Sequence, residues 1–503
     1  MKICMRIAFL GASFLFSTFP ASAQNKATHN PTWWAKFQIL AQNGSLPGGG
    51  PTLSSAVGAN VDVSNECGPQ SETFIAINPN RPKQLAAGSN EIFRLPMRGY
   101  FSGDDGASWG GVDLPLPPAI GTNGTDFGSD PTLAFDSSNN AFYGYIVVFF
   151  GAAFNTPSNG VSINGTEMAV ARSTDGGKTW PQVTFFEFNS GENHFNDKPM
   201  ITADQNAVSP FRDSVYIGWD AAVGGSSSGG IRLARSRDGL SFTTTRIDNP
   251  SGPGNAIGVT VTTGPQGQVY AAWNDIAANT ITFNSSFDGG VTWGTPVVIA
   301  AKRIPFDIGI PAEFSRRALV YPACDADRSM GSQRGRISCA WMDLTPDGLD
   351  TDIYASVSDD QGATWSPRSR VAESLGGVDR FNQWLATDPV TGAVNVSFYD
   401  TRNDSTGKKF ETDIFLSQGD GVTFGPSLRV TDAKSNEHDC GGIFPCPSIN
   451  YGNQQGDYEG VAAFGGVVHP IWTDSRRNTE RAGDPTCGRG RGIMEEVFTT
   501  TVK

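Results

Sequence analysis

Two short segments join ionisable side chains in combinations that occur once each in the chain. Residues 196–199 read Asn-Asp-Lys-Pro and residues 456–460 read Gly-Asp-Tyr-Glu-Gly. Arginine binds carboxylate and sulfate groups through two parallel hydrogen bonds, so arginines near such segments would favour an anionic ligand. The candidate residues of this kind are Glu72, Arg94, Asp130, Asp197, Lys198, Arg317, Tyr399, Arg402, Asp457, Tyr458, Glu459 and Arg476. They form one site only if the fold brings them together.

A recurring motif, Ser-x-Asp-x-Gly-x-x-Trp, indicates the structural elements that would position these candidate residues. Intact copies begin at Ser102, Ser173, Ser286 and Ser358. Two imperfect copies comprise Ser236, Asp238 and Phe242, and Ser417, Gly421 and Phe424, with Gly419 in place of the Asp. The Ser and Asp side chains can hydrogen-bond to the backbone of a tight turn, while the Trp packs beneath it. A hydrophobic run precedes each copy, so the motif predicts repeated β-hairpins and a repeat fold.

A second repeat sets the number of these units. A hydrophobic run ends in an aromatic residue and then an acid at 219–220, 273–275, 341–343, 399–400 and 472–474. Another strand-like run lies upstream of each, and residues 74–88 and 132–147 show the same order. Seven such pairs at intervals of about 60 residues predict an all-β, seven-bladed β-propeller, since a four-stranded blade fills that length. Six blades is the alternative. Residues 61–64 are expected to supply the outer strand of the last blade.

In a propeller, the starts of the inner strands and the loops after the second strands share one face. The candidate residues occupy these positions, so we expect carboxylates, arginines and tyrosines to converge there. The acid after the second-strand aromatic recurs in five blades, which favours a turn cap at Asp400 and Asp474. The arginine two residues later occurs only at Arg402 and Arg476.

The N-terminal residues predict export. Lys2 and Arg6 precede an apolar stretch at 7–19 and then Ala-Ser-Ala at 21–23. This is the pattern of a secretory signal peptide cleaved after residue 23, so the protein is expected to be secreted or periplasmic. Residues 24–60 would form an extension and residues 61–503 the propeller. No later stretch reaches the roughly 20 apolar residues of a membrane-spanning helix.

The net charge limits the possible ligands, and the cysteine content predicts disulfide bonds. The formal net charge of −13 argues against nucleic acid as a ligand. Six cysteines follow the signal segment, and among fifteen possible pairings we favour Cys324–Cys339, Cys440–Cys446 and Cys67–Cys487. No cofactor is expected. A structural calcium ion at Asp325 and Asp327, or within 343–352, is the alternative.

The motif resembles the Asp-box, or bacterial neuraminidase repeat, of sialidases and related secreted propellers. That resemblance implies three arginines on a sugar carboxylate, a tyrosine nucleophile assisted by a Glu, and an Asp acid/base. Carried onto this chain, it implies Arg94, Arg317, Arg402 and Arg476 as anion ligands. It further implies Tyr399 or Tyr458 as the nucleophile, and Asp130 or Asp197 as the acid/base. The segment 93–96 is similar to the family's F/Y-R-I-P signature. It lies beside the first Asp-box, whereas the family has this signature well upstream, so a full arginine triad does not carry over.

Three functions follow as hypotheses. The first is a secreted glycoside hydrolase acting on acidic, sialic-acid-type glycans. The second is a non-catalytic propeller, expected to be monomeric, that binds glycans or proteins. The third is a polysaccharide lyase with His194 or Tyr458 as its base.

Overall fold

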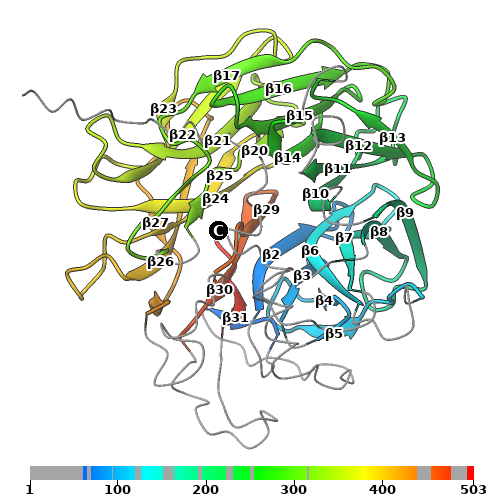
Figure 1. Ribbon diagram of the computed structural model, residues 1–503, viewed down its shortest axis with the longest axis horizontal. Coiled ribbons are helices and arrows are strands. Elements are labelled where there is room, and N and C mark those ends of the chain that lie inside the picture. Colours follow the sequence, from blue (N-terminus) through cyan, green and yellow to red (C-terminus); the bar gives the residue numbers. More distant parts are fainter. Residues whose placement is uncertain are drawn as a thin grey trace, which may run out of the picture.

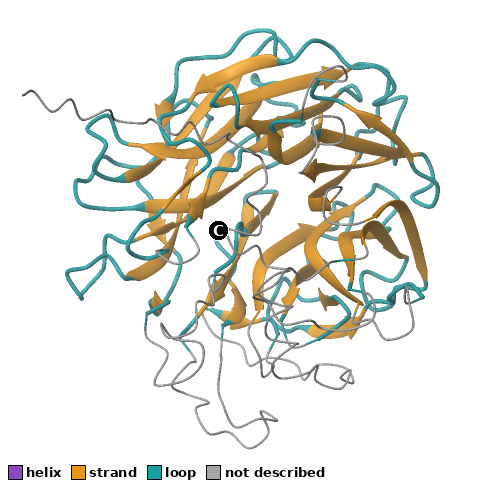
Figure 2. Ribbon diagram, viewed as in Figure 1, coloured by secondary structure: helices purple, strands orange, loops and turns teal. Residues whose placement is uncertain are grey.

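The computed structural model describes residues 60–64, 70–92, 94–118, 126–150, 163, 165–190, 195–222, 230–249, 254–313, 317–438, 455–476 and 495–503. Every regular element in these residues is a β-strand (Figure 2). Apart from one short two-stranded pair, the described strands form seven antiparallel sheets around a common centre, each running outward from an inner strand (Figure 1). The fold is a seven-bladed β-propeller, which confirms the blade number inferred from the aromatic–acid repeat.

The first three blades follow the chain without interruption. Blade 1 contains β2 (Gln70–Ile77), β3 (Leu85–Glu91), β4 (Arg98–Ser102) and β5 (Gly110–Asp113). Blade 2 contains β6 (Asp126–Phe135), β7 (Ala141–Phe149), β8 (Gly165–Ser173) and β9 (Gln182–Ser190). Blade 3 contains β10 (Phe195–Ala203), β11 (Val215–Ala222), β12 (Ile231–Ser236) and β13 (Thr243–Arg246).

The next three blades repeat this order with small additions. Blade 4 contains β14 (Ala256–Thr263), β15 (Val269–Asp275), β16 (Thr280–Ser286) and β17 (Val297–Ala301). Blade 5 contains β20 (Ala323–Ala326), β21 (Ile337–Leu344), β22 (Thr351–Ser358) and β23 (Ser369–Arg370), preceded by the pair β18 (Asp307–Ile308) and β19 (Ala318–Leu319). Blade 6 contains β24 (Arg380–Thr387), β25 (Val394–Asp400), β26 (Glu411–Gly419) and β27 (Leu428–Arg429), and β28 (Ser435–Asn436) also pairs with β26.

The seventh blade closes the ring by combining the two ends of the propeller. It contains β29 (Gly460–Phe464), β30 (Val467–Asp474) and β31 (Glu496–Thr499), and its outer strand is β1 (Val61–Asp62). Val61 is paired with Thr499 and Asp62 with Phe498. This pairing confirms the closure expected from residues 61–64, and it leaves the blade with four strands like the others.

The Ser-x-Asp-x-Gly turns join the third and fourth strands of a blade and have the hydrogen bonds expected from their sequence. In the copy at 358, Ser358 Oγ donates to Asp360 Oδ1 at 2.8 Å and accepts from the Gly362 N–H at 2.8 Å. Asp360 also accepts from the Thr364 N–H and hydroxyl, at 2.8 and 2.6 Å. The imperfect copy at 417 differs from expectation, because Asp420, rather than position 419, accepts the turn N–H groups of residues 422 and 423.

Removing one of these carboxylates should therefore weaken the propeller by a small, measurable amount. Asp360→Ala leaves the Thr364 N–H without its acceptor, so we expect a loss of about 1–2 kcal/mol in the free energy of unfolding. Urea denaturation measures this loss. Asp359→Ala is the control, because the neighbouring Asp359 is mostly exposed and forms only a surface ion pair with Arg336. Equal losses in the two variants would contradict a capping role for Asp360.

One disulfide lies within the described residues. Cys324 and Cys339 face each other across β20 and β21 and are bonded, as the sequence predicted. Cys67, Cys440, Cys446 and Cys487 fall outside the described residues, as do residues 1–23, for which the sequence predicts a signal peptide, and residues 24–59. Among the described residues, no helix has the length and apolar character needed to cross a membrane.

Candidate functional site

A β-bulge near the start of the inner strands aims a set of polar side chains at the propeller axis. The pairing of inner and second strands slips by a residue in five blades, between 71 and 74, 129 and 132, 197 and 200, 257 and 260, and 381 and 384. The bulged residues have left-handed backbone angles: φ is 55° at Glu72, 60° at Asp130, 48° at Lys198, 68° at Gly258 and 47° at Asn382. Bulges of this kind redirect side chains, and side chains other than glycine adopt such angles at a cost in free energy.

Gly258 of this series and Gly456, which precedes β29, make room for their neighbours. A Cβ atom at Gly258 would lie 1.9 Å from Tyr321 Cδ1, and one at Gly456 would lie 2.4 Å from Glu72 Cγ. Both glycines also have positive φ angles. The backbone around the propeller axis therefore leaves room for the side chains of Tyr321 and Glu72 beside the axis.

Asp130 and Asp197 form a pair of buried carboxyl groups. Both accept the backbone N–H of Lys198, Asp130 Oδ2 at 3.1 Å and Asp197 Oδ1 at 3.0 Å. Burial, followed by the charges of Asp197 and Glu72 and by a hydrogen bond from Asp130 to Asp197, raises the pKa of Asp130 well above its usual range. A hydrogen bond between two carboxyl groups needs a proton on one of them, so this pair favours the state in which one proton lies between Asp130 and Asp197.

A polar network holds this pair in place. Ser129 Oγ donates to Asp130 Oδ1 at 2.8 Å, and Asn90 Oδ1 accepts the Asp130 N–H at 2.8 Å. The amide of Asn90 donates in turn to Glu72 Oε2 at 2.7 Å. Glu72 is thereby fixed beside the pair as a third acid.

The amine of Lys198 lies in a cage of aromatic rings. Its Nζ is 4.2 Å from the ring centre of Tyr321, 4.3 Å from that of Tyr458 and 5.3 Å from that of Trp384. Lys198 is 3% exposed, and within the described residues its Nζ has no hydrogen-bond partner. Burial lowers the pKa of Lys198 to about 8, against the opposing effect of the nearby carboxylates of Glu72, Asp130, Asp220 and Asp197.

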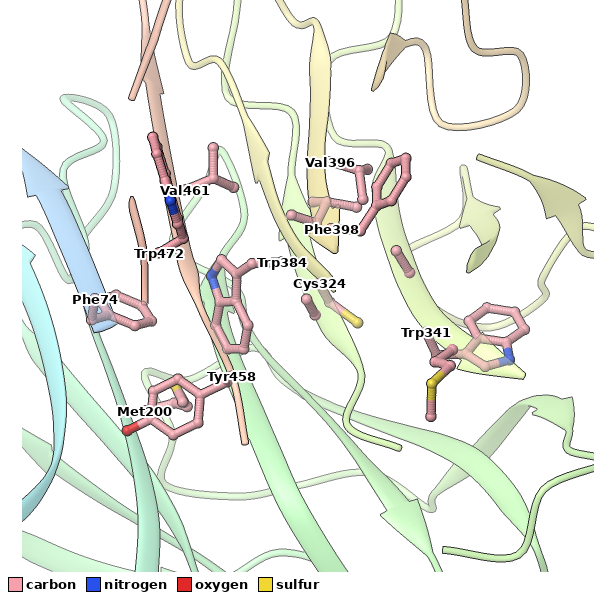
Figure 3. Packing of buried hydrophobic residues seen from close by; sticks show 14 of the residues in the cluster. Phe74, Met200, Cys324, Trp341, Trp384, Val396, Phe398, Tyr458, Val461 and Trp472 are labelled. Carbon is pink, nitrogen blue, oxygen red and sulfur yellow. The ribbon is translucent and has the colours of Figure 1, made fainter. Parts of the chain in front are cut away.

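Two rings of this cage, those of Trp384 and Tyr458, lie near two further apolar side chains, Met200 and Phe74 (Figure 3). Figure 3 shows Trp384, Tyr458, Met200 and Phe74 converging there, and the rings of Phe74 and Trp384 meet edge to face at 5.4 Å. Tyr458 Oη donates to the Pro131 carbonyl oxygen at 3.1 Å, so its hydroxyl lies against the bulge that carries Asp130. Further along the inner strands, a cavity of about 170 Å³ is lined by residues of all seven blades.

The structure therefore brings Asp130, Asp197, Lys198 and Tyr458 together. Asp457 borders the cluster, since its N–H donates to Glu72 Oε1 at 3.1 Å. The sequence did not single out Asn90, Tyr321 or Trp384 as site residues. The only available signal was that Tyr321 and Trp384 belong to the runs predicted as inner strands.

The four arginines suggested as anion ligands are paired with carboxylates elsewhere. Arg94 pairs with Asp113 at 3.5 Å, Arg317 with Asp307 at 3.0 Å, Arg402 with Asp400 at 2.6 Å and also with Glu373, and Arg476 with Asp474 at 2.7 Å and also with Asp432. Arg402 and Arg476 occupy equivalent places in blades 6 and 7. Their guanidinium groups lie over the rings of Phe415 and Phe498.

Asp400 and Asp474 act as the turn caps that the repeat predicted. Asp400 Oδ1 accepts the Arg402 N–H at 2.7 Å, and Asp474 Oδ1 accepts the Arg476 N–H at 2.8 Å. Each carboxylate also binds the guanidinium group of the same arginine. The acid and the arginine thus form one structural unit at the end of the second strand.

Tyr399 belongs to a separate buried contact that joins three blades. Its Oη lies 2.8 Å from both Glu459 Oε1 and the Thr473 carbonyl oxygen, and Glu459 Oε2 accepts the hydroxyl of Thr73. Burial raises the pKa of Tyr399 well above its usual range, and burial raises the pKa of Glu459 to about 7. This is a tyrosine–glutamate pair of the kind that the resemblance implied, placed between blades 6, 7 and 1.

The raised pKa of Glu459 predicts a pH-dependent contribution to stability. Because the folded state holds the proton more tightly than the unfolded state, this contribution is complete below about pH 4.5 and is lost as pH rises to about 7. Glu459→Gln mimics the protonated acid. The free energy of unfolding of Glu459→Gln relative to that of the wild type should rise over that range by up to about 3 kcal/mol. Urea denaturation at each pH measures this difference. A difference between variant and wild type that stays constant from pH 4 to 8 would contradict this role.

The acid-rich loops considered for calcium are held by arginines. Asp325 pairs with Arg328 at 2.7 Å, and Asp343 pairs with Arg368 at 2.6 Å. Within the described ranges, no three His, Cys, Asp or Glu side chains are grouped closely enough to hold a metal ion.

The propeller is structurally similar to sialidase and trans-sialidase propellers at low sequence identity. The leech intramolecular trans-sialidase has 12% identity and a TM-score of 0.46, over 74% of this chain and 69% of that one. The NanB sialidase of Streptococcus pneumoniae has 9% sequence identity and a TM-score of 0.47, over 77% of this chain and 72% of that one. A PL25 ulvan lyase has 12% sequence identity and a TM-score of 0.37, over 66% of this chain and 77% of that one. Similarity of this degree carries no argument about the reaction. No protein-family model and no curated protein matches the chain.

Proposed function

We propose that this protein is an exported glycoside hydrolase acting on acidic glycans, with its active site in the axial cluster of Asp130, Asp197, Lys198 and Tyr458. The observation that carries the proposal is a proton-sharing carboxyl pair beside a buried amine that lacks a hydrogen-bond partner. Perturbed ionisable groups gathered at the axis of a fold are a common mark of an active site. The disulfide between Cys324 and Cys339 accords with an oxidising compartment.

The members of the cluster suit distinct steps. A carboxyl group that keeps its proton near neutral pH can donate it to the leaving-group oxygen as the glycosidic bond breaks. The ammonium group of Lys198 would meet the carboxylate or sulfate of the sugar. Because Asp130 and Asp197 share a hydrogen bond, they form one acid/base unit rather than an acid and a separate nucleophile, and Tyr458 takes the part of the nucleophile. Burial raises the pKa of Tyr458 well above its usual range, so its hydroxyl must pass its proton to a neighbouring carboxylate as it attacks the anomeric carbon. Water then cleaves the bond between sugar and tyrosine, which releases the sugar and restores the phenol. Asp457 is only half-buried, so the ligand would approach from its side.

The test is turnover of acidic substrates by the protein lacking residues 1–23. An aryl sialoside, a polyuronate and a sulfated polysaccharide would each be followed for new reducing ends and for unsaturated, ultraviolet-absorbing products. New reducing ends without unsaturation support hydrolysis. Unsaturated products would replace it with a lyase reaction, and the absence of any product at high protein concentration would overturn the proposal.

A second candidate function, glycan binding without catalysis, is favoured by the state of the arginines. Arg402 and Arg476, for example, each bind two carboxylates and so lack the free guanidinium group that a sialidase-type anion site needs. The same set of glycans, immobilised, separates the two functions. Retention of a glycan that the protein never cleaves would support the binding function.

A further inference from the structure

A groove on the side of the propeller, between two hairpin turns, has the features of a second binding site. It lies between blades 3 and 4 and has a volume of about 280 Å³. It is lined by Ser214, Tyr216, Arg235, Ser236, Arg237, Asp238, Ser241, Thr243, Asp288, Gly289 and Val291. This volume is near the lower end of the roughly 300–1,000 Å³ of small-molecule sites. None of these residues belongs to the axial cluster.

Two arginines line the groove without a carboxylate partner. Arg235 Nη1 donates to the Gly290 carbonyl oxygen at 3.4 Å, and Arg237 Nη1 donates to the Pro210 carbonyl oxygen at 3.1 Å. Among the residues that the structure describes, no Asp or Glu pairs with either one. This distinguishes them from the arginines that the sequence suggested as anion ligands. Their remaining N–H groups are available to an anion.

Two buried hydroxyl groups on the wall of the groove lack hydrogen bonds of good geometry. Tyr216 is 1% exposed and Ser214 is 2% exposed, and the hydroxyl groups of these two residues contact each other without forming a hydrogen bond of good geometry in the described part of the chain. Burial raises the pKa of Tyr216 to about 12, which the contact with Ser214 and then the charges of Arg237 and Arg235 oppose, while the charge of Asp204 adds to the rise. Tyr216, Arg235 and Arg237 all line the same groove, where one ligand can meet them. A buried hydroxyl whose only contact has poor geometry is stabilised by an acceptor that a ligand brings.

The rim of the groove adds apolar and hydroxyl surface. Val291 lines the groove, is 50% exposed and lies on the turn that contributes Asp288. Ser241 and Thr243 line the opposite strand and turn. An apolar surface beside an anion site suits a sugar ring, which has an apolar face and a polar edge.

We propose that this groove binds a sugar residue bearing a carboxylate or sulfate group. The anion lies between Arg235 and Arg237, which can each donate two parallel hydrogen bonds, and accepts from the hydroxyl of Tyr216. The sugar ring lies against Val291. Such a site would hold an acidic polysaccharide on the side of the propeller, independently of any reaction at the axis.

Calorimetric titration of the full chain with tetragalacturonate, a sulfated disaccharide and neutral maltotetraose tests the proposal. We expect binding of one or both acidic probes and none of maltotetraose. Arg235→Ala/Arg237→Ala should weaken that binding roughly tenfold or more, and the two-lysine variant should weaken it less. Tyr216→Phe, which removes only the hydroxyl, should weaken it by a smaller factor. Arg81→Ala is the control, since Arg81 is exposed on blade 1 and carries the same charge.

The outcomes separate this site from the axial one. Binding that survives Asp130→Asn but is lost in the double arginine variant supports the groove, whether or not the protein cleaves glycans. A preference for one probe identifies the anion as carboxylate or sulfate. Equal weakening by Arg81→Ala, equal affinity for maltotetraose, or no binding of either acidic probe would overturn the proposal.

Discussion

Replacing Asp130 by asparagine is expected to reduce kcat/KM on an acidic glycan by about 10²–10⁴-fold while leaving the fold intact. The asparagine keeps the shape of the side chain and one of the two acceptor oxygens, so it can still accept either the hydroxyl of Ser129, which binds Oδ1 of Asp130, or the N–H of Lys198, which binds Oδ2. It cannot hold the shared proton, so the leaving group would depart without protonation. Steady-state kinetics on the substrate identified by product release measures the effect, and thermal unfolding checks the fold.

The pH profile gives this prediction a second readout. The charge of Asp197 helps to raise the pKa of Asp130, so Asp197→Asn should lower that pKa. A reaction that needs protonated Asp130 falls as pH rises through its pKa, and the alkaline limb of the profile should therefore move to lower pH. Asp136→Asn is the matched control, because Asp136 is buried in the same blade but caps the turn after β6. Unchanged kinetics in Asp130→Asn would remove Asp130 from the mechanism.

The architecture was predictable from the sequence because each blade repeats a local pattern. A strand ending in an aromatic and an acid, as at Trp472 and Asp474, needs only short-range information. Asp474 caps the turn through its own neighbour, Arg476. Residues 61–64 were recognised as an outer strand because the last blade otherwise lacked one. The same reasoning placed Asp130, Asp197 and Lys198 at the starts of inner strands, where they meet at the axis.

The partners of the site residues were not predictable in the same way. The bulges that aim Glu72, Asp130 and Lys198 at the axis involve left-handed backbone at residues other than glycine, which leaves no mark in composition. The arginines were chosen by spacing, but their roles depend on carboxylates from distant segments, as Arg402 depends on Glu373. The cage around Lys198 joins Tyr321, Trp384 and Tyr458 from three different blades.

A buried arginine in blade 6 should be the most costly side chain to remove. Arg380 is 1% exposed, and its guanidinium group bridges Asp352 at 2.7 Å and Asp400 at 2.8 Å while donating to the Glu373 carbonyl oxygen at 2.9 Å. Arg380→Met keeps much of the volume but leaves two buried carboxylates without their shared partner. We expect a loss of about 3–5 kcal/mol in the free energy of unfolding, measured by urea denaturation.

The pH dependence of this loss distinguishes an electrostatic cause from a packing cause. Burial already raises the pKa of Asp352 against the opposing charge of Arg380, so removing the arginine should raise it further. Asp400 keeps its pair with Arg402 and Asp352 keeps its pair with Arg370, so protonation of Asp352 at lower pH relieves the part of the charge that Arg380 had balanced, and the loss should be smaller at pH 5 than at pH 8. Arg336→Met is the control, since Arg336 pairs with the exposed Asp359, and it should cost less than about 1 kcal/mol at either pH. A loss of stability in Arg380→Met that does not change with pH would show that Arg380 acts through packing, because a loss of packing alone involves no group that gains or loses a proton.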